Sequence, residues 1–490
     1  MNHLDVAIVG AGPTGLALAC ELRLAGVSCR VFERRKDDPN ITRAFAVHAR
    51  TLELLDARGL ADRLVERGLV VPSVQPTPKT VLDLSKIDSR YPMLLIVAQS
   101  GTERVLADRA RELGAEVVSG AEVVGLAQDG DEVRLDLDGP GGRYSVRASY
   151  VVGADGAHST VRRLLGVDFV GRQYETHILL ADVQVDRPPS DLLLGTANVG
   201  GLVLLVPYGD GWFRAIAWDR TRDRVPLGEP VTADEVRDAF RRIAGDDFGI
   251  GEPRWRTRFL SERRQARHYR VGRVFLAGDA AHVHSPLGGQ GMNTGIQDAF
   301  NLGWKLAAAV HGWAPPGLLD SYHRERHQVG ARVLALTDGF NRLALSSTRL
   351  GLWARQTAIR TLVRVPPVRR RVVGRITGVG IGYDRPRGAH PCAGRRLPDF
   401  GDAREAYRAL RTGRFVLVTR AAAGLAAGLE DDTGWSERLV SVDLAPAEGA
   451  PAVLLLRPDG YVAWASDRAD RDEVRQALRH WLGPVRAGQR

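Results

Sequence analysis

The sequence contains little cysteine, little lysine and no long apolar run. Its three cysteines (Cys20, Cys29 and Cys392) show neither a CxxC pair nor a metal-ligand spacing, so we expect no disulfide framework. No apolar stretch approaches the roughly 20 residues that a membrane-spanning helix needs. No charged and then apolar leader precedes the first predicted strand. These absences lead us to expect a cytoplasmic protein without a membrane partner.

Arginine carries nearly all of the positive charge. The formal net charge is +10, yet lysine occurs only at Lys36, Lys79, Lys86 and Lys305. The arginines are scattered and do not alternate with aromatic residues, so the sequence does not predict nucleic-acid binding. An excess of positive potential also attracts phosphorylated small molecules.

The chain opens with a βαβ unit whose first turn is rich in glycine. Strands are predicted at 5–9 and 28–32 and a helix at 16–25, and Gly10-Ala11-Gly12-Pro13-Thr14-Gly15 follows the first strand. In a GxGxxG turn the first glycine allows the tight turn, the second lets a pyrophosphate approach, and the third lets helix and strand pack closely. Glu33 ends the second strand, where an acid binds ribose hydroxyls. The sequence therefore predicts binding of FAD or NAD here.

A second acid and glycine follow a later strand. The stretch 149–163 reads SYVVGADGAHSTVRR, in which an apolar strand ends at Gly153-Ala154-Asp155-Gly156 and Ser159 is a candidate helix cap. Read alone, Asp-Gly is an ordinary turn. Read with the first turn, it predicts a second acid beside the same dinucleotide.

The most informative stretch is 272–304, GRVFLAGDAAHVHSPLGGQGMNTGIQDAFNLGW. A short strand at 274–277 ends at Gly278-Asp279, and a glycine-rich loop leads into a helix from about Met292. Backbone N–H groups at a helix start favour an electron-rich partner, and the glycines let a flat ring lie against the main chain. Asp279 is placed for a polyol hydroxyl. An ordinary glycine-rich turn is the alternative interpretation.

Two other chemistries are not supported by the spacing of their candidate residues. Asp279, His282 and His284 have a spacing that resembles metal ligands, but no further ligand pairs with them, so we expect no metal. No serine lies in a G-x-S-x-G elbow, so serine hydrolysis is not predicted.

The remaining chain predicts a β-rich insertion and a small terminal domain. Strands at 178–185, 202–207, 212–218 and 254–261 suit a sheet that covers a bound ring and lines a substrate pocket. Aromatic residues in these strands either face a ligand or pack in the core; they are Trp212, Phe213, Trp218, Trp255 and Phe259. An amphipathic helix is predicted at 51–67, and the proline- and glycine-rich segment 386–398 is a predicted linker.

GAGPTG with Glu33, the Ala154-Asp155-Gly156 segment and LAGDAAHVHSPLGGQGMNTGIQDAFNLGWKLA together resemble the class A flavoprotein monooxygenases. These are the p-hydroxybenzoate hydroxylase-like single-component aromatic hydroxylases, and the resemblance covers roughly 5–326. The length, Gln99-x-x-x-Glu103 and the terminal domain are similar to the bacterial aromatic polyketide hydroxylases, whose terminal domain is thioredoxin-like. With no cysteine in 395–490, thiol exchange is not expected of that domain, and packing or assembly remains as its role.

The resemblance implies an α/β fold of three parts. A discontinuous Rossmann-like FAD-binding domain is expected over 1–76, 99–170 and 270–385. A β-rich substrate-binding domain is expected over 77–98 and 171–269, and a thioredoxin-like domain over 395–490.

The resemblance also implies tightly bound, non-covalent FAD. Gly10, Gly12 and Gly15, with Pro13 and Thr14, would hold the pyrophosphate, and Glu33, with Arg34 beside it, the adenosine ribose. Arg43 and Gln99 would approach the phosphates and ribityl chain, and Val123 would pack near the adenine. Asp155 and Gly156 would serve FAD and passing NAD(P)H, and Gly278 and Asp279 would bind the ribityl chain. The residues implied around the isoalloxazine are Pro286, Gly289, Gln290, Gly291, Met292 and Asn293.

The implied activity is hydroxylation of an aromatic substrate, expected to be a polycyclic polyketide of antibiotic biosynthesis. NADPH or NADH would reduce FAD as a transient visitor, because only one dinucleotide fold is predicted, and O2 would then form a flavin C4a-hydroperoxide that the ring attacks. No catalytic acid or base is assigned, and the chain is expected to be a monomer or homodimer. The alternatives are a Baeyer–Villiger oxygenase, a dehydrogenase, an antibiotic-inactivating monooxygenase, and a flavin-containing protein that sequesters an antibiotic.

We predict that Asp279→Ala loses FAD, because the carboxylate is expected to accept hydrogen bonds from the ribityl hydroxyls. The ratio of flavin to protein absorbance in the purified variant measures this. A fully flavinylated variant would place the ribityl site elsewhere.

Overall fold

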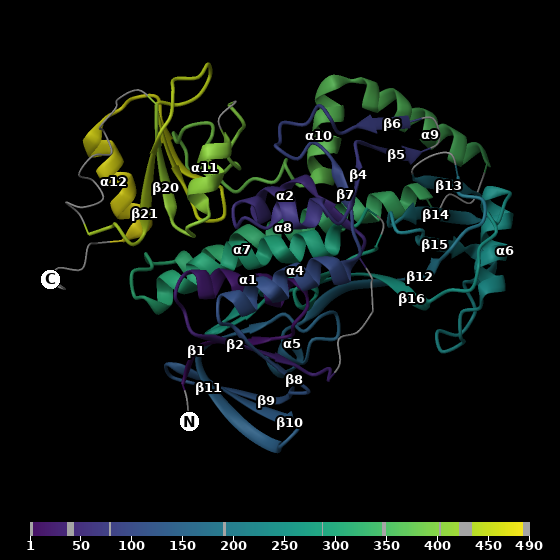
Figure 1. Ribbon diagram of the computed structural model, residues 1–490, viewed down its shortest axis with the longest axis horizontal. Helices are drawn as coiled ribbons and strands as arrows, with labels where there is room; N and C mark the ends of the chain where they lie inside the picture. The colour runs from purple at the N-terminus through teal and green to yellow at the C-terminus, as the bar shows by residue number, and fades with distance from the viewer. Residues whose placement is uncertain are drawn as a thin grey trace.

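The computed structural model describes residues 3–36, 44–77, 80–189, 193–286, 288–344, 349–400, 403–420 and 434–483. Three larger sheets organise these residues (Figure 1). The sheet near the N-terminus lies at the bottom of the view, the middle sheet at the right, and the C-terminal sheet at the upper left. The long helices α7 (Gln290–Val310) and α8 (Leu318–Ala344) run between them.

The first sheet has eight strands and contains the nucleotide-binding unit. Its main path is β17-β18-β11-β1-β2-β8, and β10 and β9 continue antiparallel from β11. β1, β2, β8, β11 and β18 are mutually parallel where they pair. The strands are β1 (Leu4–Val9), β2 (Cys29–Glu33), β8 (Glu116–Ser119), β9 (Glu122–Asp129), β10 (Glu132–Gly139), β11 (Gly142–Gly153), β17 (Arg270–Val271) and β18 (Val274–Leu276).

Helices α1 (Pro13–Leu24) and α7 pack against each other at two glycines of α7. A Cβ on Gly295 would lie 2.3 Å from Thr14 Oγ1, and one on Gly303 would lie 2.5 Å from Glu21 Cβ. Gly278, just after β18, meets the same threonine, because its Cβ would lie 2.5 Å from Oγ1. Thr14 therefore fits between two segments that carry glycine at the point of contact. Helices α4 (Gln99–Glu112) and α5 (Thr160–Leu164) complete this domain.

The middle sheet has six strands in the order β13-β14-β15-β12-β16-β19. Helix α6 (Ala233–Ala244) packs on one face, against side chains such as Leu179, Ala181 and Val203. The other face carries Ile178, Leu180, Ile216 and Trp218 and contacts Phe45. The strands are β12 (Phe169–Val183), β13 (Leu194–Asn198), β14 (Gly201–Pro207), β15 (Phe213–Asp219), β16 (Trp255–Ala266) and β19 (His282–Val283).

Two predicted boundaries in this part of the chain were wrong. The strand predicted at 178–185 is the second half of β12, which begins at Phe169 and pairs with β16 on both sides of a bulge between Gln173 and His177. The helix predicted at 51–67 is two helices, α2 (Ala49–Asp56) and α3 (Ala61–Val65). Gly59 separates them with a φ of 70°, a left-handed conformation that ends a helix.

Small strands and two helices complete the central part. Strands β3 (Ala46–His48), β7 (Leu94–Ile96) and β4 (Leu69–Val71) form one antiparallel sheet, and β5 (Ser73–Thr77) and β6 (Thr80–Asp83) form another. Helices α9 (Arg349–Arg364) and α10 (Pro366–Thr377) pack over this second pair. In Figure 1 these two helices lie at the top, apart from the C-terminal domain.

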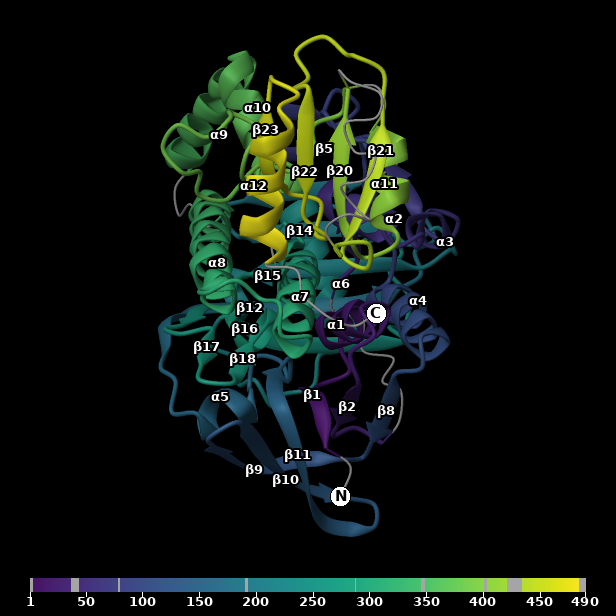
Figure 2. The ribbon, with the colours of Figure 1, turned by 90° about the vertical axis from the view of Figure 1, so that its left-hand side faces the viewer.

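The C-terminal sheet has the order β21-β20-β22-β23, in which only β20 and β21 pair in parallel. Helices α11 (Ala403–Leu410) and α12 (Arg471–Leu482) lie on either side of it (Figure 2). This order and these directions are those of a thioredoxin-like sheet. The strands are β20 (Phe415–Thr419), β21 (Leu439–Asp443), β22 (Val453–Leu456) and β23 (Val462–Ser466).

Buried arginines join the terminal domain to the rest of the chain. The Arg58 guanidinium donates to both carboxylate oxygens of Glu21, at 2.7 and 2.6 Å, and to the Leu410 and Pro458 carbonyls. In the other direction, Arg457 donates to both oxygens of Glu325 on α8, at 2.8 and 2.9 Å. Each of the two parts therefore supplies one buried arginine that donates hydrogen bonds to the other part.

We predict that Gly295→Val destabilises the protein by about 1–3 kcal/mol, the usual cost of overpacking a filled contact. Thermal unfolding and the flavin content of the purified variant measure the effect. Gly339→Ala is the matched control, because a Cβ there meets no described atom within 4 Å and alanine suits a helix. Equal melting temperatures for the two variants would contradict the prediction.

Candidate active site

The three glycines of the first turn have the three expected environments. A Cβ on Gly10 would lie 2.4 Å from the Ala154 carbonyl oxygen, and one on Gly15 would lie 2.0 Å from the Gly10 oxygen. Gly12 instead has no described atom within 4 Å of its Cβ position. Pro13 begins α1 at this point. Two glycines thus allow close chain contact while the middle one leaves the helix start open, which fits a bound pyrophosphate.

Glu33 lies beside this turn and is held in place by hydrogen bonds. Its carboxylate accepts from the Ala11 N–H at 2.8 Å and from the backbone and side chain of Arg35. Burial works to raise the pKa of Glu33, but the bonds from Arg35 and Ala11 outweigh it and keep the pKa below its usual value. Arg34, predicted beside the ribose, is exposed, and it is Arg35 that pairs with Glu33.

Asp155 directs its carboxylate at a helix. It accepts from Ser159 Oγ at 2.5 Å and from the Thr160 and Val161 N–H groups at the start of α5. Ser159 also caps α5, as predicted, by accepting from the Arg162 N–H. Gly156 follows with a φ of 81°.

Gln99, Val123 and Arg43 are three further residues that were predicted to contact FAD. Gln99, at the start of α4, accepts from the Ala44 N–H at 3.0 Å and donates to Glu103 at 2.8 Å. Val123 is 3% exposed and packs in the core of the first sheet. Arg43 lies outside the described residues. Gln99 therefore anchors the segment that follows Arg43, and the cofactor roles of all three remain predictions.

Asp279 stands exposed between two buried neighbours, Gly278 and Ala280. The turn that presents it is held from behind by Asp298 of α7, whose carboxylate accepts from the Gly278 N–H at 3.0 Å. Asp298 also bonds His282 Nε2 at 2.7 Å and Arg326 Nε at 2.6 Å. Burial alone would raise the pKa of Asp298, but Arg326 and His282 hold it below its usual value.

The loop before α7 is held by Asn293 and Gln290. The Asn293 amide donates to the Ala46 and Gly289 carbonyls and accepts from the His48 N–H at 2.9 Å. The Gln290 amide donates to the Gly288 and Ile376 carbonyls. Met292 is 9% exposed and packs in the core. These side chains face the protein, so any contact that they make with a ring comes through their backbone.

Pro286 and two glycines shape the rest of this loop. The Gly289 N–H donates to the Pro286 carbonyl, and Gly289 has a φ of 61° at the start of α7. Gly291, in the first turn of α7, faces Asp279 and His284. Leu287 lies outside the described residues.

The face of the middle sheet that contacts Phe45 is apolar and aromatic. Trp218, Trp255 and Phe259 lie on it, whereas Phe213 packs under α6 on the opposite face. Trp212 joins a separate cluster with Tyr208, and Arg254 lies 4.2 Å over its ring.

The same face holds a buried ion pair. Arg214 Nε donates to Asp182 Oδ1 at 2.6 Å, Tyr208 donates to the same oxygen at 3.2 Å, and Trp255 lies 4.9 Å from the guanidinium. Both charged side chains are at most 3% exposed. The pair is therefore an internal tie between β12 and β15 and presents no charge to a ligand on this face.

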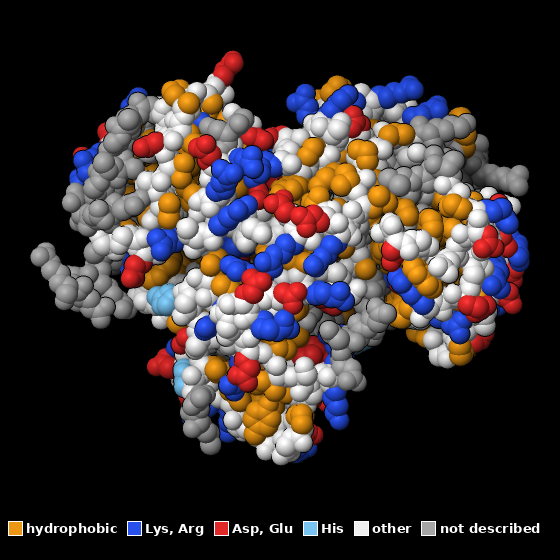
Figure 3. All heavy atoms as spheres, viewed as in Figure 1, with side chains coloured by type: hydrophobic (Ala, Val, Ile, Leu, Met, Phe, Trp, Pro, Cys, Tyr) orange, Lys and Arg blue, Asp and Glu red, His pale blue; other side chains and the backbone are white. Residues whose placement is uncertain are grey.

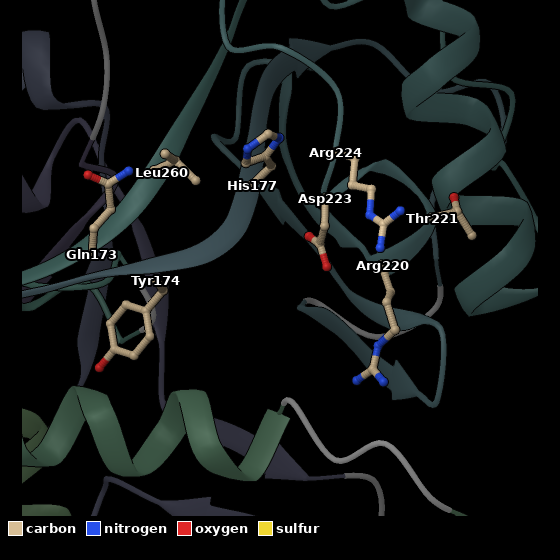
Figure 4. Close-up of a pocket in the computed structure, with 8 residues that line it drawn as sticks. All are labelled: Gln173, Tyr174, His177, Arg220, Thr221, Asp223, Arg224 and Leu260. Carbon is tan, nitrogen blue, oxygen red and sulfur yellow. The ribbon is translucent and has the colours of Figure 1, made fainter.

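A cavity of about 740 Å³ opens at the bulge of β12 (Figure 4). Tyr174 points towards α8, where its hydroxyl bonds Asp338, and His177 and Leu260 point the other way. The cavity is lined by Gln173, Tyr174, His177, Arg220, Thr221, Asp223, Arg224 and Leu260. Asn341, next to Asp338 on α8, accepts from Ser285 Oγ at 2.9 Å. The cavity thus adjoins the helix that contacts the glycine-rich loop.

Charges of both signs are mixed on the surface. On the face shown in Figure 3, Lys and Arg side chains are interspersed with Asp and Glu. Among the helices that the structure describes, none is both long and apolar enough to cross a membrane.

Comparison with protein families decides the identity. Residues 3–337 match the model of an FAD binding domain, and residues 390–485 match that of the C-terminal domain of aromatic-ring hydroxylases. The chain belongs to the FAD-dependent aromatic-ring hydroxylases. The resemblance predicted from the three glycine-rich stretches is confirmed, and so is the α/β fold class.

Relatives of this FAD-dependent aromatic-ring hydroxylase match nearly its whole length. Rifampicin monooxygenase from Streptomyces venezuelae is 41% identical over 99% of this chain and 100% of its own. The structure of the anhydrotetracycline hydroxylase OxyS from Streptomyces rimosus is 39% identical, with a TM-score of 0.88 over 99% of this chain and 100% of that one. The Diels-Alderase PyrE3 of pyrroindomycin biosynthesis is 33% identical, with a TM-score of 0.83 and coverage of 99% and 100%.

Several residues around the candidate site could not be identified from the sequence. Asp298, His48 and the Asp182–Arg214 pair are buried polar groups whose partners are distant in sequence. A buried charge inside an apolar helical stretch was the available signal for Asp298, in the sequence GIQDAF.

We predict that His48 makes stability pH-dependent. Burial lowers the pKa of His48 from 6.5 to about 4. As the pH falls, His48 of the unfolded chain becomes protonated near pH 6.5, whereas His48 of the folded protein stays neutral until about pH 4. The free energy of unfolding should therefore fall by about 3 kcal/mol across this window as the pH decreases.

His48→Gln should flatten this dependence, since an amide does not titrate. Denaturant unfolding at several pH values measures the difference between variant and wild type. His480→Gln, at an exposed histidine of α12, should leave it unchanged. Parallel wild-type and His48→Gln curves would contradict the assignment.

Proposed function

We propose that this flavin-dependent aromatic monooxygenase consumes NAD(P)H and O2 to hydroxylate a polycyclic aromatic substrate of polyketide type. The observation that carries the proposal is the convergence of three segments on one side of α7. These are the open turn at Gly12, the exposed carboxylate of Asp279 and the loop before α7, with the aromatic face of the middle sheet beyond Phe45. The names of the rifampicin and tetracycline relatives support the substrate class.

FAD, when bound, supplies reduction by NAD(P)H and activation of oxygen. The residues present fit it. The Gly10–Gly15 turn would hold the pyrophosphate, Glu33 the ribose and Asp279 the ribityl chain. The N–H groups at the start of α7 would stabilise negative charge at the pyrimidine edge of the ring.

Asp155 and Asn293 are proposed to act by positioning. Asp155 caps α5 and so fixes the turn at Gly156, which adjoins the Gly10 turn through Ala154. Asn293 ties β3 to the first turn of α7. Both would keep the cofactor's walls in register without touching the reacting atoms.

The substrate is proposed to lie between the flavin and the apolar face of the middle sheet. Trp255 and Phe259 would pack against its rings and exclude water, and the buried Asp182–Arg214 pair would hold β12 and β15 in register behind them. The cavity at the β12 bulge, of about 740 Å³, is within the size range of small-molecule sites and would extend this pocket. We further propose a cytoplasmic monomer or homodimer.

The test is anaerobic reduction of the bound flavin by NADPH or NADH, with and without a panel of phenolic polycyclic compounds. A compound that speeds bleaching many-fold identifies a substrate-gated hydroxylase and its substrate class. In air the product should gain one oxygen with its ring connectivity unchanged. A product of altered ring connectivity would indicate Baeyer–Villiger insertion instead.

The Diels-Alderase relative favours cycloaddition as a second candidate. Conversion of a polyene without NAD(P)H consumption or change in mass would establish it. Equally slow bleaching with every phenol would contradict a phenol-gated hydroxylase.

A further inference from the structure

The imidazole of His284 lies at the edge of the glycine-rich loop. Its Nδ1 is 2.8 Å from the Ser285 carbonyl oxygen. A carbonyl oxygen has no hydrogen, so Nδ1 must be the donor of this bond. The tautomer of the ring is therefore fixed by its neighbour.

The second ring nitrogen of His284 is then a bare acceptor. Burial lowers the pKa of His284, which keeps the ring neutral and leaves a lone pair on Nε2. Nε2 is buried and has no hydrogen-bond partner among the described residues. A buried acceptor without a partner is uncommon in folded proteins and calls for an explanation.

Nε2 faces the same point as the carboxylate of Asp279. A Cβ on Gly291 would lie 3.6 Å from His284 Nε2 and 3.7 Å from Asp279 Oδ1. Glycine at 291 keeps this point free of a side chain. Two acceptors from different segments therefore converge beside the first turn of α7, where a ligand with several hydroxyl donors fits.

The neighbouring His48 and His282 each have an unpartnered Nδ1 among the described residues, but neither atom is among those nearest the Gly291 Cβ position. His282 Nε2 is bonded to Asp298 at 2.7 Å. The His48 ring is bonded to the Gly288 backbone on the β3 side of the loop. Among these three histidines, only His284 directs a free acceptor at Gly291.

We propose that His284 Nε2 accepts a hydrogen bond from a ribityl hydroxyl of FAD, as a second acceptor beside Asp279. This inference rests on the placement of FAD given above. Two parts of FAD carry adjacent hydroxyl donors, the adenosine ribose and the ribityl chain. The ribose is placed at Glu33, so the ribityl chain is the part that would reach His284. His284 is thus assigned as a cofactor-binding residue.

Two substitutions separate the two ring nitrogens. The amide of His284→Asn reaches the position of Nδ1 and can still donate to Ser285, but it removes the acceptor at Nε2. The amide of His284→Gln reaches the position of Nε2 and restores an acceptor oxygen there. Titration of the apoprotein with FAD, followed by flavin fluorescence, should give a Kd about three- to tenfold higher for His284→Asn, the loss that one net hydrogen bond represents. His284→Gln should stay close to wild type, and so should His480→Asn.

FAD analogues that lack single ribityl hydroxyls identify the donor. The analogue that lacks the bonded hydroxyl should bind the wild-type protein more weakly than FAD does. His284→Asn should bind this analogue and FAD with equal affinity, because it has already lost the acceptor. The same analogue should still be discriminated by Asp279→Asn, which retains His284. If His284→Asn does not fold, the test is made with Asp279→Asn alone. If Asp279→Asn binds FAD and every analogue with equal affinity, the proposal is overturned.

Equal FAD affinity of wild type and His284→Asn also overturns it, as does equal weakening by Asn and Gln, which would show a packing role. These results are independent of the activity assay. If wild type binds FAD but hydroxylates nothing, the proposed function fails while the His284 assignment stands.

Discussion

The carboxylate of Asp298 is the point on which the site depends. It is fully buried and joins three segments: the Gly278 turn through a backbone N–H, His282 of β19, and Arg326 of α8. A buried carboxylate is tolerated only when its oxygens are bonded and its charge is matched. The arrangement therefore fixes the turn that presents Asp279 relative to the N-terminus of α7, which is proposed to face the flavin. The position of the exposed Asp279 carboxylate therefore depends on the buried ion pair between Asp298 and Arg326.

Close contact between α1 and α7 provides the second constraint. Thr14 belongs to the Gly10–Gly15 turn, Gly278 to the turn after β18, and Gly295 to α7. Because glycines occupy the points where Thr14 meets these segments, the parts proposed to hold FAD are placed by direct packing. The middle sheet then adds an aromatic face with a buried ion pair, so that rigid elements surround the candidate site.

The sequence was most informative where the chemistry lies in consecutive residues. The family could be predicted from the turn 10–15 and the stretch 278–293, because glycine spacing and one carboxylate are local features of the sequence. His48 could not, since its backbone partner Asn293 is 245 residues away. The orientation of Asp155 was also beyond prediction, because capping of the adjacent helix competes with ligand binding for the same oxygens. The break in the predicted helix at 51–67 came from Gly59, whose left-handed conformation depends on its neighbours.

The seam between the terminal domain and the FAD-binding part has a consequence for how the chain unfolds. Arg58 reaches two carbonyls across the seam, and Arg457 returns to Glu325. Without the domain, Arg58 would keep Glu21 and Glu325 would keep Lys305, but side chains that the seam now buries would meet water. The domain therefore contributes backbone acceptors and one bidentate ion pair to a seam that is bonded from both sides. We expect the two parts to unfold as one cooperative unit.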